Sequence, residues 1–152
     1  MRPNAEKLRS EIVSLSDAKT WDAAHLEWSL ARIEFAEEPE ACLCGHFPIV
    51  ELCYLHNRVN SNEALVGNVC VTRFFDLGSD LVFAGLRRVL ADVTRPLNDA
   101  AIDFAVEQRW IDGWEENFLR DTARKRLPSP RQMAVRLRIN TVVLARVRRG
   151  PR

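Results

Sequence analysis

The spacing of hydrophobic and polar positions changes along the chain and predicts helices first, then strands. Apolar residues recur at helical spacing over residues 4–15. Thr20 is a good N-cap for a second helix that begins at Trp21. From 30 to 35 apolar and charged residues alternate, which favours a half-buried strand, with continuation of the helix as the alternative. The first 36 residues therefore predict helices followed by a strand.

The middle of the chain has the composition of a β-hairpin. Residues 47–56 and 65–71 are rich in β-forming side chains, and the Asn- and Ser-rich segment 57–63 between them suits a hairpin loop. The acidic segment 37–40 contains a proline and predicts a turn that leads into the hairpin. We therefore expect two antiparallel strands here.

From residue 79 onward the apolar positions return to helical spacing. The clearest boundary is a capping box, in which Ser129 is the N-cap, Pro130 the first helical residue and Gln132 the N3 residue. This helix should run to about Val147. Earlier in the region we expect a helix capped by Ser79, a helix capped by Asn98, a turn over 110–113 and a helix that carries Trp114, Phe118 and Leu119.

The cysteines are confined to one segment. All four lie between Cys42 and Cys70. The N-terminus has no apolar segment typical of a secretory signal, and no apolar run approaches the roughly 18 residues that cross a bilayer. We therefore expect an intracellular, cytoplasmic protein without a membrane partner. In a reducing compartment clustered cysteines indicate metal before disulfide.

The spacing within this segment predicts a zinc site. Cys42 and Cys44 flank one residue, Gly45 supplies the conformational freedom for a sharp turn, and the hairpin returns the chain to Cys70. Tetrahedral zinc needs four nitrogen or sulfur donors. We predict His46 as the fourth ligand, with Cys53 as the alternative and His56 as a third option; the competing interpretation makes Cys53 a buried apolar residue and His56 a loop residue.

This segment resembles a family of small zinc-finger-like proteins of bacteria and mobile genetic elements, with related modules in large DNA viruses. The shared pattern is Cys-x-Cys-Gly-His, an apolar β-segment, an Asn-containing turn and Val-Gly-x-x-Cys-(Val/Ile)-x-x-Phe. The matching residues are Cys42, Cys44, Gly45, His46, Ile49, Asn57, Val66, Gly67, Cys70, Val71 and Phe74. Parts of 120–140 are also similar. The resemblance implies a zinc-finger-like module and no established activity.

Catalytic zinc is the alternative to a structural ion. It would need three protein ligands, an open position and a nearby general base, often Glu. Glu51 and Glu63 lie in the segment, but neither stands in a known catalytic spacing, and the common hydrolase and deaminase motifs are missing. We therefore predict a protein that is not an enzyme, and keep a zinc-dependent hydrolase as the alternative.

The net charge of +1 conceals a strong asymmetry. Residues 1–119 carry 11 Lys and Arg against 20 Asp and Glu, whereas 120–152 carry 11 against one. A basic segment of this kind indicates an anionic partner or a solvated surface. We expect the four tryptophans to lie in the core, so they are not base-stacking platforms. The predicted nucleic-acid-binding residues are Arg120, Arg124, Lys125, Arg126, Arg131 and Arg138.

Together these patterns predict an α+β, mainly helical fold. A treble-clef-like zinc knuckle and β-hairpin would be followed by a C-terminal helical bundle. We expect a single domain over 1–152, made of N-terminal helices and a strand (1–36), a zinc-binding hairpin module (37–78) and a helical region with a basic final helix (79–152). The predicted function is a zinc-binding accessory protein that binds nucleic acid. The alternative is a protein–protein adaptor that docks through its zinc hairpin or final helix.

Overall fold

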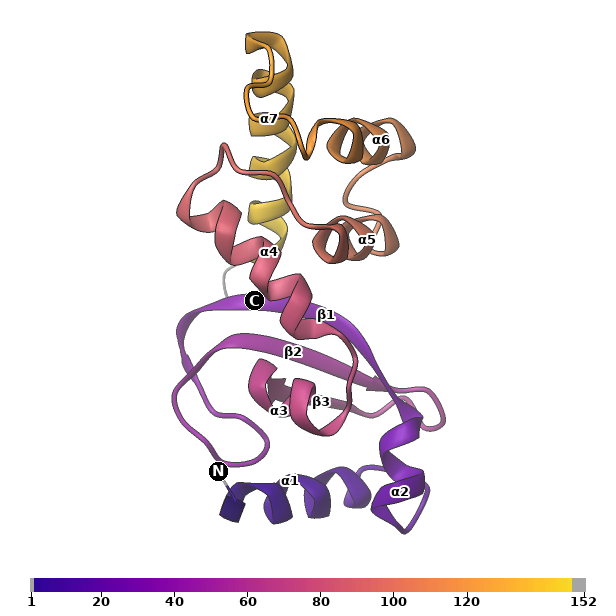
Figure 1. Ribbon diagram of the computed structural model, residues 1–152. Helices are drawn as coiled ribbons and strands as arrows, with labels where there is room; N and C mark the ends of the chain where they lie inside the picture. The colour runs from indigo at the N-terminus through magenta and orange to yellow at the C-terminus, as the bar shows by residue number, and fades with distance from the viewer. Residues whose placement is uncertain (1, 149–152) are drawn as a thin grey trace. The chain divides into compact units, whose positions relative to one another are not determined.

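The computed structural model describes residues 2–148, with side chains from Asn4 onward. It shows an α+β protein in which about 52% of the residues are helical, so the predicted class is confirmed (Figure 1). The chain divides into two compact units at Ser79 and Asp80; the single domain over 1–152 stays a prediction. The end of the predicted 79–152 region, including Arg149, lies outside the described residues. Within the described part of the chain, none of the helices combines the length and apolar character that a membrane crossing needs.

The first unit is built on a three-stranded antiparallel sheet with the order β1-β2-β3. Its strands are β1 (Trp28–Glu40), β2 (Ile49–Asn57) and β3 (Glu63–Gly67). Ile33 of β1 pairs with Cys53 of β2, and Cys53 pairs with Val66 of β3. All three side chains are fully buried, so this row lies in the core of the unit.

Short helices complete the first unit. They are α1 (Arg2–Ser14), α2 (Trp21–Ala24), the 3₁₀-helix η1 (His25–Glu27) and α3 (Asn68–Phe74). Leu8 and Ile12, four residues apart on α1, are both fully buried, as the helical spacing predicted. The α3 helix follows β3 directly, so the hairpin leads into a helix start (Figure 1).

Two predictions for this unit were wrong. The acidic segment 37–40 is the end of β1, because Glu40 pairs with Ile49 after an irregularity in the ladder; its proline is tolerated on an edge strand. The predicted strand 65–71 ends at Gly67, and residues 68–71 are helical. Here the contacts of a buried asparagine, Asn68, override the β-preference of the neighbouring valines.

The second unit consists of helices. They are α4 (Ser79–Ala91, whose first residue belongs to the first unit), α5 (Asp99–Glu107), α6 (Gly113–Thr122) and α7 (Pro130–Val147). Both halves of the predicted capping box at Ser129 are present, and α7 has the predicted bounds. Arg136 and Asn140 of α7 are buried; they donate hydrogen bonds to backbone carbonyls of Val93, Thr94, Arg95 and Thr122.

Two predicted roles in the helical region were also wrong. Ser79 is the first residue of α4 and not the residue before it, and its Oγ donates to Oδ1 of Asn68 at 2.6 Å. Trp114 is not a core residue: it is 60% exposed and stacks on Phe118, one turn along α6. The stacked ring of Phe118 covers part of the indole, so the tryptophan can lie at the surface.

Candidate metal centre

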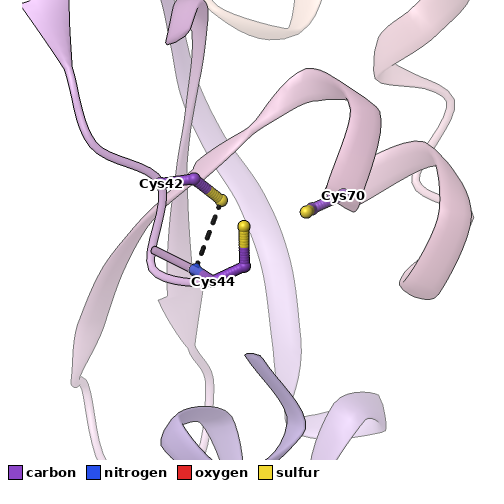
Figure 2. Close-up of side chains that lie close together, drawn as sticks. All are labelled: Cys42, Cys44 and Cys70. Carbon is purple, nitrogen blue, oxygen red and sulfur yellow. Dashed lines mark hydrogen bonds between the residues drawn. The ribbon is translucent and has the colours of Figure 1, made fainter. Parts of the chain in front are cut away.

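Three cysteine side chains from distant parts of the chain meet in the first unit. Cys42 and Cys44 lie in the turn between β1 and β2, and Cys70 lies in the first turn of α3. Their Sγ atoms all lie within 4.8 Å of one another, and all three residues are buried. Figure 2 shows the sulfurs pointing toward a common space. A metal ion could be held there, because thiolates on one tetrahedral ion are separated by distances of this order.

The turn that carries Cys42 and Cys44 is held by its own backbone. The N–H of Gly45 donates to the carbonyl of Cys42 at 2.8 Å, and the N–H of Cys42 donates to the carbonyl of His46 at 2.9 Å. Gly45 has a φ of +92°, a conformation that side chains with a Cβ rarely adopt. The glycine therefore allows the chain to reverse between the two cysteines and the next strand.

Backbone amides also point at the sulfurs. Sγ of Cys42 accepts from the N–H of Gly67 at 3.2 Å and from the N–H of Cys44 at 3.5 Å (Figure 2). Sγ of Cys44 accepts from the N–H of His46 at 3.3 Å. Such donors stabilise negative charge on sulfur and fix the orientation of metal ligands.

The thiols of the trio differ in acidity. Hydrogen bonding from the Cys70 thiol lowers the pKa of Cys42 to about 5, and the amides of Gly67 and Cys44 act in the same direction. The pKa of Cys70 is raised, first by its hydrogen bond to Cys42 and then by burial. Burial raises the pKa of Cys44. Cys42 is therefore the sulfur that ionises first, and a cation would favour ionisation of the other two.

The three predicted alternatives for a fourth ligand lie outside this group of donors. Cys53 is fully buried in the sheet, and burial raises its pKa to about 12, as expected of a neutral core thiol. His56 lies four residues along β2 from Leu52, the partner of Gly67, which is about 13 Å in a strand. His46 lies beside the trio, but its side chain is exposed.

Two residues near the trio were not predicted as a pair from the sequence. Oε1 of Glu51 accepts from Nδ2 of Asn68 at 2.9 Å, and Oδ1 of Asn68 accepts from Ser79. Both Glu51 and Asn68 line the same cavity as the three cysteines. They are 17 residues apart in sequence, and only the pairing of β2 with β3 brings them together.

The predicted nucleic-acid-binding residues belong to the second unit and differ in their surroundings. Arg120 forms ion pairs with Asp99, Asp103 and Glu116, and Arg138 lies 4.0 Å from Glu115. The remaining four are exposed and occupy the loop between α6 and α7 or the first turn of α7: Arg124, Lys125, Arg126 and Arg131. Leu127, in the same loop, is 92% exposed.

Comparison with known proteins gives no match. The chain matches no protein-family model, and no curated protein and no solved structure matches it significantly. The interpretation of the site therefore depends on its own geometry and chemistry.

Proposed function

We propose that this chain is a zinc-binding accessory protein whose ion is held by Cys42, Cys44 and Cys70. The observation that supports the proposal is the convergence of three buried sulfurs within 4.8 Å. A single buried cysteine usually behaves as a small apolar side chain. Three that converge, with amide donors aimed at two of them, fit a thiolate site better than a packed core.

Zinc fits this donor set for two reasons. Thiolate ligands favour zinc and other soft ions over magnesium or calcium. The order of elements is also that of a treble-clef zinc finger: a glycine turn with two ligands, a hairpin, and a ligand in the first turn of a helix. We propose that residues 42–70 form such a knuckle-and-hairpin module, as the family resemblance implies. Our sequence prediction placed His46 at its fourth position.

Metal analysis of the natively purified protein tests the zinc proposal. We expect one zinc per chain by native mass spectrometry. Cys42→Ser and Cys70→Ser should each lose the ion and much of the stability, because metal binding free energy contributes to folding. Cys53→Ala is the matched control: it removes a buried sulfur outside the trio, so zinc should be retained while the free energy of unfolding falls by about 1–2 kcal/mol. Much less than one equivalent of metal in the wild type would refute the site.

A second function, nucleic-acid binding, is supported by the exposed cations of the α6–α7 loop and of the first turn of α7. Arg124, Lys125, Arg126 and Arg131 form the basic loop surface, and within the described residues the three arginines make no ion pair. Arg120 is left out because three carboxylates already neutralise its charge. We propose that the basic loop surface contacts phosphates, which gives salt-sensitive binding with weak sequence preference.

A salt titration with single-stranded DNA, duplex DNA and RNA tests this second function. Four phosphate contacts predict a slope of about −3 to −4 in a plot of log affinity against log salt for duplex DNA. The triple variant Arg124→Glu, Arg126→Glu and Arg131→Glu should lose binding and keep its metal content. A charge-matched control reverses exposed arginines elsewhere, Arg73, Arg88 and Arg95. If wild type binds none of the nucleic acids at low salt, the protein–protein adaptor becomes the better account.

A further inference from the structure

A cavity of about 380 Å³ lies directly beside the thiol trio. Cys42, Cys44 and Cys70 form part of its wall, so a metal ion among the sulfurs would border the cavity. Much of the remaining wall is apolar and includes Ile49 and Val69. Small-molecule sites commonly combine apolar walls with a few fixed polar groups.

The number of donors decides what kind of metal site this is. Structural zinc sites have four protein ligands, whereas sites that exchange a ligand have three and one open position. Among the described residues the group of potential ligands within 4.8 Å contains only Cys42, Cys44 and Cys70. The exposed imidazole of His46 is not one of them. Because the three cysteines also form part of the cavity wall, the fourth position of a bound ion would be open to a donor from the cavity.

The cavity also contains a fixed carboxylate. Asn68 donates to Oε1 of Glu51, and Ser79 holds the other end of the Asn68 amide by donating to Oδ1 at 2.6 Å. The amide is thereby oriented with its NH₂ group toward Glu51. A ligand that enters the cavity would meet a soft metal at one end and negative charge at Glu51.

We propose that the cavity binds a small aminothiol, whose sulfur takes the fourth position of the metal and whose ammonium group pairs with Glu51. This inference rests on the proposed zinc site and changes its fourth ligand from His46 to an external donor. The thiol binds as a thiolate and releases its proton to solvent, since a metal ion lowers the pKa of a coordinating thiol. The carbon atoms of the ligand contact the apolar wall.

Cobalt-loaded full-length protein tests the proposal, because thiolate-to-cobalt charge-transfer absorption grows with each bound thiolate. Three probes of similar size differ in charge: cysteamine, 2-mercaptoethanol and 3-mercaptopropionate. We expect affinity to fall in that order, by about tenfold between the first two, because a charged hydrogen bond in a partly enclosed site contributes a change of this order. Glu51→Gln keeps the acceptor for Asn68 and should remove the preference for cysteamine.

The possible outcomes distinguish a failure of the aminothiol proposal from a failure of the metal site. Failure to bind one cobalt or zinc per chain would refute the metal site. Bound cobalt with a spectrum that no thiol changes would overturn the aminothiol proposal and leave the metal site intact. A response that appears only in His46→Ala would show that the imidazole occupies the fourth position. An equal response to all three probes, unchanged in Glu51→Gln, would refute the role of the carboxylate. Cobalt content after gel filtration verifies that the probes do not extract the ion.

Discussion

Glu27 joins three segments of the first unit through one carboxylate. Its Oε2 accepts from the N–H of Ala18 at 2.8 Å, and its Oε1 accepts from the N–H of Asp17 at 3.0 Å and from Nδ2 of Asn57 at 2.8 Å. Asn57 is fully buried, and its Oδ1 accepts from the N–H of Val59 in the hairpin loop. One acidic side chain thus links the turn after α1 to the end of β2.

These hydrogen bonds give the stability of the protein a predicted pH dependence. The pKa of Glu27 is lowered from its ordinary value of 4.5, first by the Asn57 side chain and then by the Asp17 amide. A carboxyl group with a lowered folded-state pKa stabilises the fold above its unfolded pKa, and this stability is lost as pH falls through the folded pKa. Wild type should therefore exceed Glu27→Gln in unfolding free energy at pH 7, and the difference should shrink well below pH 4.5.

Urea unfolding at several pH values measures this difference. The exposed residue Glu37 provides the control, since Glu37→Gln changes the same chemical group at the surface. A gap between wild type and Glu27→Gln that stays constant from pH 7 to pH 3 would contradict the proposed linkage. So would an equal pH dependence in the Glu37 variant.

At the scale of elements, the contact between the N-cap residue of α5 and the helix α4 depends on a glycine. Asn98 caps α5 by accepting from the N–H of Ala101 at 2.9 Å, and its Nδ2 donates to the carbonyl of Leu81 in α4 at 2.8 Å. A Cβ at Gly85 would lie 2.1 Å from Oδ1 of Asn98. The absence of a side chain at this position is what lets the capping amide fit between the two helices.

We predict that Gly85→Ala destabilises the second unit although alanine is the better helix former. The gain in helix propensity is about 1 kcal/mol. Displacement of the cap and overpacking cost more, so we expect a net loss of about 1–3 kcal/mol. Gly113→Ala is the control, because nothing lies within 4 Å of the added Cβ. Thermal unfolding of both variants measures the effect, and a stabilised Gly85→Ala would show that Asn98 moves without cost.

Elements with local boundary signals could be predicted from the sequence, and elements bounded by distant partners could not. The start of α7 follows from Ser129, Pro130 and Gln132, which lie within its first turn. The end of β1 depends on Glu40 meeting Ile49, and the start of α3 depends on contacts of Asn68 with the preceding strand and the following helix. These partners are distant in the sequence, so a local spacing pattern does not identify them.

The same distinction applies to the candidate site. The convergence of Cys42, Cys44 and Cys70 followed from a short motif and a hairpin that returns the chain. The Glu51–Asn68 pair depends on strand register, so the cysteine spacing did not indicate it. In the basic region the sequence shows the number of charges. It could not show that Arg120 meets three acids, two of which precede it by 17 and 21 residues.

At the scale of the whole molecule, the candidate metal site and the exposed basic loop belong to different units. All four cysteines lie before Ser79, and the loop between α6 and α7 lies after it. Each unit has its own buried residues, such as Leu55 and Val66 in the first and Ile102 and Ile139 in the second. Loss of the proposed metal should therefore affect the two units unequally.

Hydrogen exchange with and without a chelator measures this inequality. If the proposed zinc is bound, its removal should accelerate amide exchange in the cysteine turn and in α3, because the ion would join these segments. Exchange in α5, α6 and α7 should stay the same within a factor of about two. Equal acceleration in both units would contradict the expected independence, and no acceleration in either would show that the ion contributes nothing to stability. Cys53→Ala with zinc bound is the control for a packing change in the first unit.

The loop between α6 and α7 has a practical consequence for work with the purified protein. Arg124, Lys125 and Arg126 are successive, exposed cleavage positions for trypsin, and exposed loops are where proteases cut first. A cut there would sever the covalent link to α7 and leave its buried residues, among them Arg136 and Ile139, in place. The nicked protein should migrate as one species under native conditions and as two in denaturant. A nucleic acid or protein bound at the loop would shield it, so the rate of nicking reports the occupancy of this surface without a label.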